Sequence, residues 1–296
     1  MAAELIDQIS NGFADYVAVA APSVVAVATG RRAVSGILWR ADVVVTSEQM
    51  LPDTTEFAVR HAGAEHVATL AGRDPGTNIA LLRLPVPAAA VLPAAAPTPR
   101  VGALALILGA AADAGTTARL AMVHEVGPAW HSQAGGRIEA LLRLDGRIGR
   151  DEGGPVLDSA GRLLGMSTAG PRRRTLVIPA ATINRVIDPL LAEGRISRGW
   201  LGVGLQPVAV PDSLRGAAGR DGGMMVVNLA SGGPAAQAGV LPGDILLDLD
   251  GTPLRRVRAL SAALGPEQIG RQISLRLLRA GALQTLAVVV APRPSA

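Results

Sequence analysis

The sequence predicts a mostly β fold in which two small β-barrels precede a third unit of strands and short helices. Three observations support this prediction. Short runs rich in Val, Ile and Leu, bounded by turn residues, fall into two groups of about six. Residues 85–100 separate these groups and hold five prolines, which remove the backbone donors that a sheet needs. From residue 199 onward, strand-like runs alternate with short helical ones.

The composition suits this fold and excludes several chemistries. The 296 residues are 49% hydrophobic, which is enough for two or three cores, yet only 2% are aromatic, so Ala, Val, Leu and Ile must fill them. The chain has no Cys, which excludes disulfides, a Cys nucleophile and Cys-based metal sites. The net charge is +4, and every basic residue is Arg. Short basic runs such as Arg172–Arg174 are more typical of solvated turns than of phosphate or nucleic-acid sites.

The beginning of the sequence bears on location. Residues 1–10 carry Glu4 and Asp7 and lack a basic start followed by an apolar run, so they do not resemble a signal peptide. The chain also has no uninterrupted apolar stretch of about 18 residues, the length that a membrane span requires. We therefore expect a cytoplasmic protein without a membrane span.

The first element, at residues 1–22, is an amphipathic helix. Its apolar side chains recur at helical spacing through residues 4–21, and it should end before Pro22, because proline disfavours helix in the residue ahead of it. The double-barrel domain follows at 23–190. The strands expected for the first barrel are 23–29, 34–39, 42–46, 56–60, 66–71 and 78–84, and those for the second are 103–108, 119–126, 137–144, 155–158, 162–168 and 175–178.

A helix at 180–192, closed by Gly194, ends the double-barrel domain, and residues 191–198 form a linker. The third unit spans 199–293. Its expected strands are 200–208, 223–229, 245–250, 271–278 and 284–291, with a short helix at 231–239 and a longer one at 254–264.

Three turn motifs in the third unit carry a resemblance. They are Gly233-Pro234-Ala235-Ala236-Gln237-Ala238-Gly239, Leu241-Pro242-Gly243-Asp244-Ile245-Leu246 and Asp250-Gly251. At these intervals, over about 95 residues, the unit resembles a PDZ domain, an α+β fold with a small barrel and helices. The resemblance implies that an extended peptide adds a strand to a sheet edge and that backbone N–H groups hold its C-terminal carboxylate.

The resemblance assigns the carboxylate loop and the groove to particular residues. The loop is Trp200-Leu201-Gly202-Val203, and the helix at 254–264 forms the other wall, with Val257, Leu260 and Leu264 on one face. The alternative is that these three apolar residues belong to the core. The partners implied are C-terminal or extended hydrophobic peptides of other proteins.

Five segments before the third unit resemble the HtrA family of trypsin-like serine proteases, which have a trypsin-like double β-barrel. In order, they are Pro22–Val25, Val45-Thr46, Gly72–Leu82, Gly153-Gly154-Pro155 with Gly161–Gly165, and Val177-Ile178-Pro179. The family also implies a homotrimer formed through N-terminal apolar residues. Phe13 and Tyr16 would suit that contact, or would pack on their own domain.

The chain departs from this family at the residues that matter for catalysis. Gln49 stands where the family has its His, Asn78 where it has Asp, and Glu152 where it has the nucleophilic Ser. Arg150 replaces the usual oxyanion-hole glycine, and Gly149 lies one place earlier. The sequence therefore predicts a protease homologue with a degenerate triad, a pseudoprotease.

These substitutions remove the groups that serine proteolysis needs. Gln49 is not basic near neutral pH, Asn78 cannot stabilise an imidazolium, and Glu152 has no route through an acyl-enzyme. We expect instead that the three side chains converge. In this arrangement Glu152 lies near the N–H groups of the former oxyanion hole and accepts a hydrogen bond from Gln49.

Three functions compete at this point. The favoured one is a peptide-binding scaffold, the second is an active endopeptidase with an unrecognised catalytic arrangement, and the third is an Arg-driven nucleic-acid binder. A Ser and a His meeting in one cleft would favour the second, and the four His are His61, His66, His124 and His131. We expect no cofactor or metal, since Glu65-His66 and His124-Glu125 lack the i, i+4 spacing of a helical zinc site.

Overall fold

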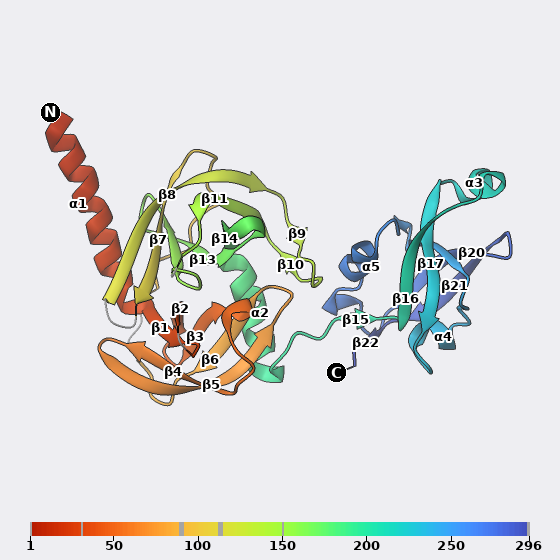
Figure 1. Ribbon diagram of the computed structural model, residues 1–296, viewed down its shortest axis with the longest axis horizontal. Helices are drawn as coiled ribbons and strands as arrows, with labels where there is room; N and C mark the ends of the chain where they lie inside the picture. The colour runs from red at the N-terminus through yellow and green to blue at the C-terminus, as the bar shows by residue number, and fades with distance from the viewer. Residues whose placement is uncertain (1, 31, 89–91, 112–114, 150, 295–296) are drawn as a thin grey trace. The chain divides into compact units, whose positions relative to one another are not determined.

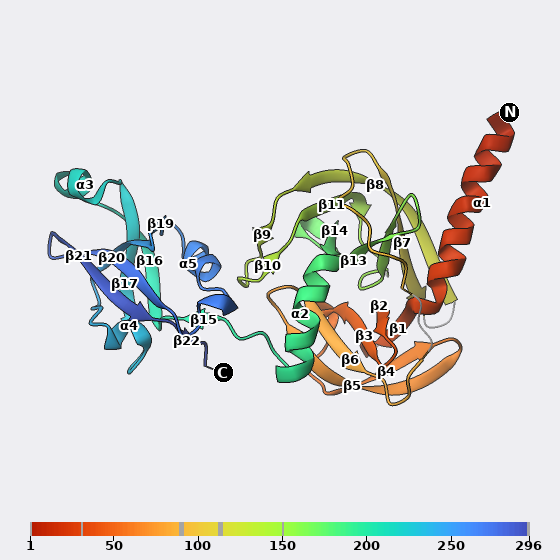
Figure 2. The same ribbon diagram turned by 180° about the vertical axis from the view of Figure 1, so that it is seen from behind.

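A computed structural model describes residues 2–30, 32–88, 92–111, 115–149 and 151–294 of the chain. Strands make up 47% of the residues and helices 21%, which confirms the mostly β fold class. The chain divides into two units (Figures 1 and 2). The barrel unit comprises residues 1–132 and 137–196, and the C-terminal unit comprises residues 133–136 and 197–296.

Six antiparallel strands close the first barrel in the order β1-β2-β3-β6-β5-β4. Alternate side chains of these strands point inward, and Val27, Leu38, Val44 and Leu82 are fully buried in a shared core. The strands are β1 (Val24–Ala28), β2 (Ala33–Arg40), β3 (Val43–Ser47), β4 (Glu56–His61), β5 (Ala64–Asp74) and β6 (Ile79–Arg83).

The second barrel closes in the order β11-β14-β13-β12-β7-β8, around a core that includes Ile107, Val123, Leu142 and Val156. A separate two-stranded sheet pairs β9 with β10. The strands are β7 (Leu104–Ala111), β8 (Gly115–Gly127), β9 (Trp130–His131), β10 (Arg137–Ile138), β11 (Leu141–Arg147), β12 (Pro155–Asp158), β13 (Leu163–Ala169) and β14 (Arg174–Pro179).

The strand expected at 137–144 is two strands, β10 and β11, with a break at Glu139. The backbone N–H of Glu139 donates to Thr182 Oγ1 at 3.1 Å, and its carboxylate pairs with Arg185 at 2.6 Å. Both partners belong to the following helix. Glu139 therefore leaves the sheet because its hydrogen bonds go elsewhere.

Two long helices flank the barrels, α1 (Ala2–Ala20) and α2 (Ala180–Glu193). The N-terminal half of α1 projects from the barrels (Figure 1), which leaves Leu5 and Ile6 exposed, while Phe13 and Tyr16 pack on their own domain. As expected, α2 ends at Gly194, which adopts a left-handed conformation and donates its N–H to Leu190. Short 3₁₀ turns are η1 (Ala21–Ser23), η2 (Glu48–Met50) and η3 (Pro171–Arg173). In the part of the chain that the structure describes, no helix is long and apolar enough to span a membrane.

The C-terminal unit is a sheet in the order β16-β17-β18-β20-β21, with β19 paired to β18 and a separate pair of β15 and β22. Its strands are β15 (Gly199–Trp200), β16 (Val203–Ala209), β17 (Gly222–Leu229), β18 (Ile245–Leu249), β19 (Thr252–Pro253), β20 (Gln272–Arg279), β21 (Ala282–Val289) and β22 (Ala291–Pro292). Its helices are α3 (Asp212–Ala218), α4 (Pro234–Gln237), α5 (Val257–Ala263) and the 3₁₀ turn η4 (Pro266–Gln268).

Two features of this unit differ from the sequence prediction. The strand expected at 200–208 is divided between β15 and β16, because Gly202 turns the chain with a φ of 77°. Helix α3 was not expected, although Pro211 at its N-cap and the left-handed Gly219 at its C-cap are typical helix boundaries. The helices expected at 231–239 and 254–264 are present but shorter, as α4 and α5.

Candidate functional site

The barrel unit brings together the three residues that the sequence analysis assigned to the catalytic positions. The Nε2 of Gln49 donates to Glu152 Oε1 at 2.6 Å, and the backbone N–H of Gln49 donates to Asn78 Oδ1 at 2.8 Å. Gln49 lies in η2, Asn78 lies just before β6, and Glu152 lies in the turn before β12. The three residues therefore converge although as many as 103 positions separate hydrogen-bonded partners.

Two hydroxyl groups that the sequence did not single out complete this cluster. Asn78 Nδ2 donates to Ser47 Oγ at 3.0 Å and to Thr168 Oγ1 at 2.5 Å. Ser47 ends β3 and Thr168 lies near the end of β13, so each is a polar residue at the close of an apolar strand. A polar residue at the end of an apolar strand was the one feature of the sequence that could have singled out Ser47 and Thr168. We call Ser47, Gln49, Asn78, Glu152 and Thr168 the polar cluster.

The Glu152 carboxylate is buried, with 1% of the residue exposed. Its Oε1 accepts hydrogen bonds from Gln49, from the hydroxyls of Ser47 (3.2 Å) and Thr168 (3.3 Å), and from the Ala169 N–H (3.2 Å). Its Oε2 is also buried and has no hydrogen-bond partner among the described residues. No guanidinium pairs with it in the described part of the chain. Hydrogen bonds to Oε1 alone therefore offset the free-energy cost of burying this carboxylate.

The expected position of the Glu152 carboxylate, near the N–H groups of the former oxyanion hole, stays a prediction. Among the described residues, its backbone donor is Ala169 on β13. The Gly149 N–H donates instead to Asp151 Oδ1 at 2.9 Å, and Asp151 also pairs with Arg119 at 2.7 Å. Arg150 lies outside the described residues.

Two glycines hold the turn that carries Glu152 against both barrels. Gly153 has a φ of 90°, and a Cβ there would lie 2.1 Å from the backbone oxygen of Ser35 on β2. A Cβ on Gly154 would lie 2.0 Å from the backbone oxygen of Leu108 on β7. Only glycine permits these approaches. The Glu152 carbonyl also accepts a hydrogen bond from the Ser35 N–H at 2.9 Å, which holds the backbone of Glu152 in place and so positions its side chain.

The loop before Asn78 is held by a different carboxylate. Asp74 is 1% exposed, and it accepts hydrogen bonds from the N–H groups of Gly76 and Thr77 and from the Thr77 hydroxyl. Asp74 is therefore occupied within its own loop and does not reach the polar cluster. Asn78 has a φ of 57°, a left-handed conformation that Asn tolerates better than most residues.

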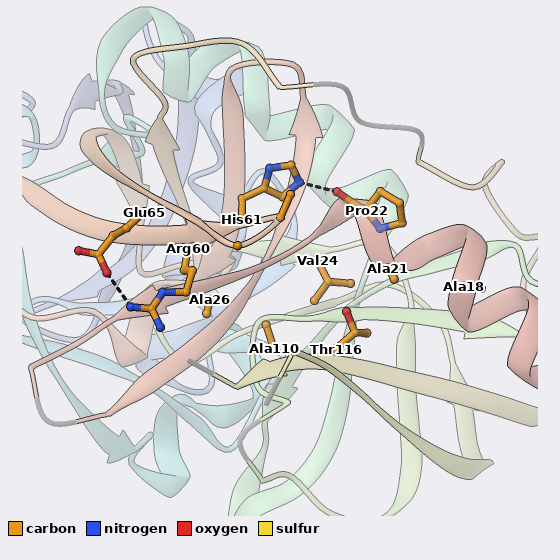
Figure 3. A pocket seen from close by; sticks show the side chains of 13 residues that line it. Ala18, Ala21, Pro22, Val24, Ala26, Arg60, His61, Glu65, Ala110 and Thr116 are labelled. Atoms are coloured by element: carbon orange, nitrogen blue, oxygen red, sulfur yellow. Dashed lines mark hydrogen bonds and ion pairs between the residues drawn. The ribbon is translucent and has the colours of Figure 1, made fainter. Parts of the chain in front are cut away.

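The histidines lie elsewhere. His61 Nε2 lies 2.7 Å from the Pro22 oxygen, at the edge of a hollow of about 980 Å³ between α1, the β4–β5 turn and β7 (Figure 3). His66, His124 and His131 lie on β5, β8 and β9. Among the described residues, no histidine contributes a hydrogen bond to the polar cluster. The hollow shares no lining residue with the cluster and forms no part of the candidate site.

The C-terminal unit offers a strand edge. Among the described strands, β16 pairs only with β17, so its other edge is free. The Gly202 carbonyl accepts a hydrogen bond from Ala230 N–H at 2.8 Å, so Val203, Leu205 and Pro207 face the free edge by strand alternation. Among the described residues, the N–H groups of Leu201 and Gly202 have no acceptor. These two amides are available to a ligand at the head of β16.

The side chains assigned to the peptide groove divide into two sets. Leu201, Leu260 and Leu264 are 1%, 8% and 4% exposed and belong to the core of the unit. The Trp200 ring lies over Gly202, where an added Cβ would approach it to 3.1 Å, and Val203 is half-buried at the start of β16. The side chain of Val257 lies outside the described residues.

Two family models match the chain. A trypsin-like peptidase domain matches residues 34–166, and a PDZ domain matches residues 199–290. Probable periplasmic serine endoproteases, DegP-like, from Brucella suis and Rhizobium meliloti are 27% and 28% identical over 263 and 264 residues. Each alignment covers 85% of this chain and 51% of the relative, so the chain spans about half the length of these curated relatives.

Solved structures give the same assignment. The HtrA-type protease AlgW with tripeptide is 27% identical with a TM-score of 0.72, and the alignment covers 96% of this chain and 98% of that chain. The serine endoprotease from Yersinia pestis has a TM-score of 0.73 at 24% identity, with 95% and 98% covered. The fold class, a trypsin-like double barrel followed by a PDZ domain, is therefore confirmed.

The relatives contradict the cytoplasmic location expected from the sequence. They are named periplasmic endoproteases, so the similarity points to the periplasm. The expectation depended on the absence of a leader-like segment. A leader is removed from a mature chain, so that absence does not decide the location.

Proposed function

This chain is an HtrA-like protease homologue with a PDZ domain, and from that premise we propose that it binds peptides without hydrolysing them. The proposed place of action is the periplasm, as in the relatives. The observation that carries the proposal is the hydrogen bond between Gln49 Nε2 and Glu152 Oε1. This bond connects the positions at which the family has its general base and its nucleophile. The connected groups are an amide, which is not a base, and a carboxylate, which here is not a nucleophile.

The polar cluster supplies no substitute nucleophile. Its hydroxyls belong to Ser47 and Thr168, which are 0% and 2% exposed. A nucleophile must reach the carbonyl of a bound substrate, and a buried hydroxyl does not. Both hydroxyls also lack a neighbouring imidazole among the described residues, so no group of the cluster matches the usual base for serine.

The C-terminal unit supports binding. The free edge of β16 and the unpaired amides of Leu201 and Gly202 provide the backbone groups for strand addition and carboxylate capture. The AlgW structures were solved with a tripeptide and a decapeptide, so similar proteins hold peptides. We propose that the ligands are C-terminal or extended hydrophobic segments, held by Trp200–Val203 and by the wall that α5 and its C-cap form with Val257, Leu260 and Leu264. The homotrimer implied by the family belongs to the same proposal.

The test for hydrolysis compares the native chain with the triple variant Gln49→His, Asn78→Asp, Glu152→Ser on casein. The native chain should show no cleavage above buffer, because it lacks base and nucleophile. Cleavage by the triple variant, and none by a matched variant with Glu152→Ala in place of Glu152→Ser, would identify the catalytic positions. Cleavage by the native chain that survives Glu152→Ala would refute the proposal and favour an unrecognised active endopeptidase.

The test for binding uses a fluorescent peptide that ends in an apolar residue with a free carboxylate, followed by anisotropy. The control is the same peptide with its C-terminus amidated. Amidation removes the charge-assisted hydrogen bonds to the loop and should weaken binding about tenfold. Equal affinity for both peptides would show that the carboxylate is not recognised.

A further inference from the structure

Three arginines gather on one surface of the second barrel. Arg147 ends β11, Arg172 lies in η3 and Arg174 begins β14. They line a pocket of about 450 Å³ whose other walls are His124 of β8 and residues 144–146 of β11. The sequence alone suggested a solvated turn at Arg172–Arg174. The fold adds Arg147 to that run from a distant part of the chain.

These arginines differ from their neighbours in having no partners. Nearby, Arg143 pairs with Glu125 at 2.6 Å and Arg119 pairs with Asp151 at 2.7 Å. In the described part of the chain, Arg147, Arg172 and Arg174 make no ion pair and no side-chain hydrogen bond. Three guanidinium groups with about fifteen N–H donors therefore face solvent around one pocket.

The backbone holds these like charges together. Arg147 and Arg174 are directly opposite each other in the β11–β14 ladder, an arrangement that is destabilising for equal charges. The Ile148 N–H donates to the Arg173 oxygen at 3.0 Å, which ties the end of β11 to η3. Arg172 itself adopts a left-handed conformation, with φ 55° and ψ 29°. The site is thus preorganised for a ligand that neutralises it.

The charge around the pocket defines the ligand. Asp145 is the one carboxylate among the lining residues, and its Oδ1 accepts the Met122 N–H at 2.7 Å. The three guanidinium charges exceed this one carboxylate charge by two. We propose that this pocket binds a dianionic phosphate group, free or carried by a small organic molecule. Guanidinium forks match phosphate oxygens in pairs, and the volume leaves room beyond one phosphate.

The test measures phosphate binding by the full chain at constant ionic strength. Isothermal titration with inorganic phosphate is compared between the native protein and the variants Arg147→Gln, Arg172→Gln and Arg174→Gln. The matched control is Arg100→Gln, an exposed arginine of the same unit that also lacks a side-chain partner among the described residues. Each pocket variant should weaken binding about threefold to tenfold, and the control should not change it. Glycerol phosphate, titrated in parallel, shows whether an ester or the free ion binds more tightly.

Thermal denaturation gives a second readout that does not depend on catalysis or on peptide binding. Arg174→Gln removes the repulsion with Arg147, so it should raise Tm without phosphate and reduce the rise in Tm that a given phosphate concentration produces in the native protein. The proposal is overturned if phosphate shows no saturable binding up to roughly 10 mM. It is also overturned if Arg100→Gln weakens binding as much as the pocket variants do.

Discussion

The hydrogen bond between Gln49 and Glu152 gives the sharpest prediction about the polar cluster. We expect a double-mutant cycle of Gln49→Ala and Glu152→Ala to show a stabilising coupling between the two side chains. Each single variant also disturbs other hydrogen bonds of the polar cluster. In the double-mutant cycle those effects on the free energy of unfolding cancel, and the remaining term is the interaction between Gln49 and Glu152.

The expected magnitude follows from the environment of the two groups. The bond is 2.6 Å long and its acceptor is a carboxylate that is 1% exposed, conditions in which a hydrogen bond contributes about 1.5–3 kcal/mol. Gln49 itself is exposed, so water replaces part of the bond once Glu152 is removed. We therefore expect a coupling at the lower end, about 1.5 kcal/mol.

The assay is equilibrium urea denaturation followed by tryptophan fluorescence. Trp39 and Trp130 report on the barrel unit, where their indole N–H groups donate to Asn184 at 3.1 Å and to the Ala140 oxygen at 3.3 Å. All four proteins of the cycle carry Trp200→Phe, so that the C-terminal unit does not contribute. This separation matters because a chain of two units need not unfold in one transition.

A neighbouring carboxylate supplies the control. Asp151 precedes Glu152 but binds Arg119 and the Gly149 N–H, so Gln49→Ala and Asp151→Ala should be additive within about 0.3 kcal/mol. A coupling between Gln49 and Glu152 that is equally close to zero would refute the reasoning. It would mean that the polar cluster holds these groups near each other without stabilising the fold.

Three further predictions follow from single residues. Gly153→Ala should lower the free energy of unfolding by about 3 kcal/mol or more, because its Cβ would lie 2.1 Å from a backbone oxygen of β2. The control, Gly63→Ala, lies in open space at φ 81° and should lower it by about 1 kcal/mol. Similar losses in the two variants, measured by thermal denaturation, would contradict the steric explanation. Pro207→Ala provides an N–H on the free edge of β16, to which a longer bound peptide can donate its carbonyl as acceptor. Peptides of about five residues should therefore bind several-fold more tightly, while the affinity for tripeptides should not change. An equal gain for both peptides would show that the new N–H does not pair with the peptide strand. Burial raises the pKa of Glu139, but the hydrogen bonds from Arg185 and Thr182 and the charges of Arg185 and Arg137 together outweigh it, so the pKa lies below the usual 4.5. The stabilisation from this carboxylate is therefore fully present above pH 4.5 and is lost as pH falls through the folded pKa. Glu139→Gln should lower stability at about pH 7 and progressively less as the pH falls below 4.5, and a loss that does not depend on pH would contradict the reasoning.

The strands were predictable because their pattern is local. The run 155–158 coincides with β12, and the run 42–46 differs from β3 by one residue at each end. Val, Ile and Leu between turn residues suffice for such predictions, since burial on a pleated surface selects them. The failures share a cause. Glu139 breaks a strand and Gly202 turns another because of contacts or backbone angles that a local pattern does not contain.

By itself, the sequence predicted the double barrel, the PDZ domain and the convergence of Gln49, Asn78 and Glu152, since motifs of glycine and apolar residues precede or follow these positions along the chain. Only the tertiary structure decided that Ser47 and Thr168 join them and that the Ala169 N–H donates to Glu152. The reason is physical. Hydrogen bonds form between atoms within about 3 Å, and the barrel registers that bring such distant residues together are set by the packing of all the strands at once.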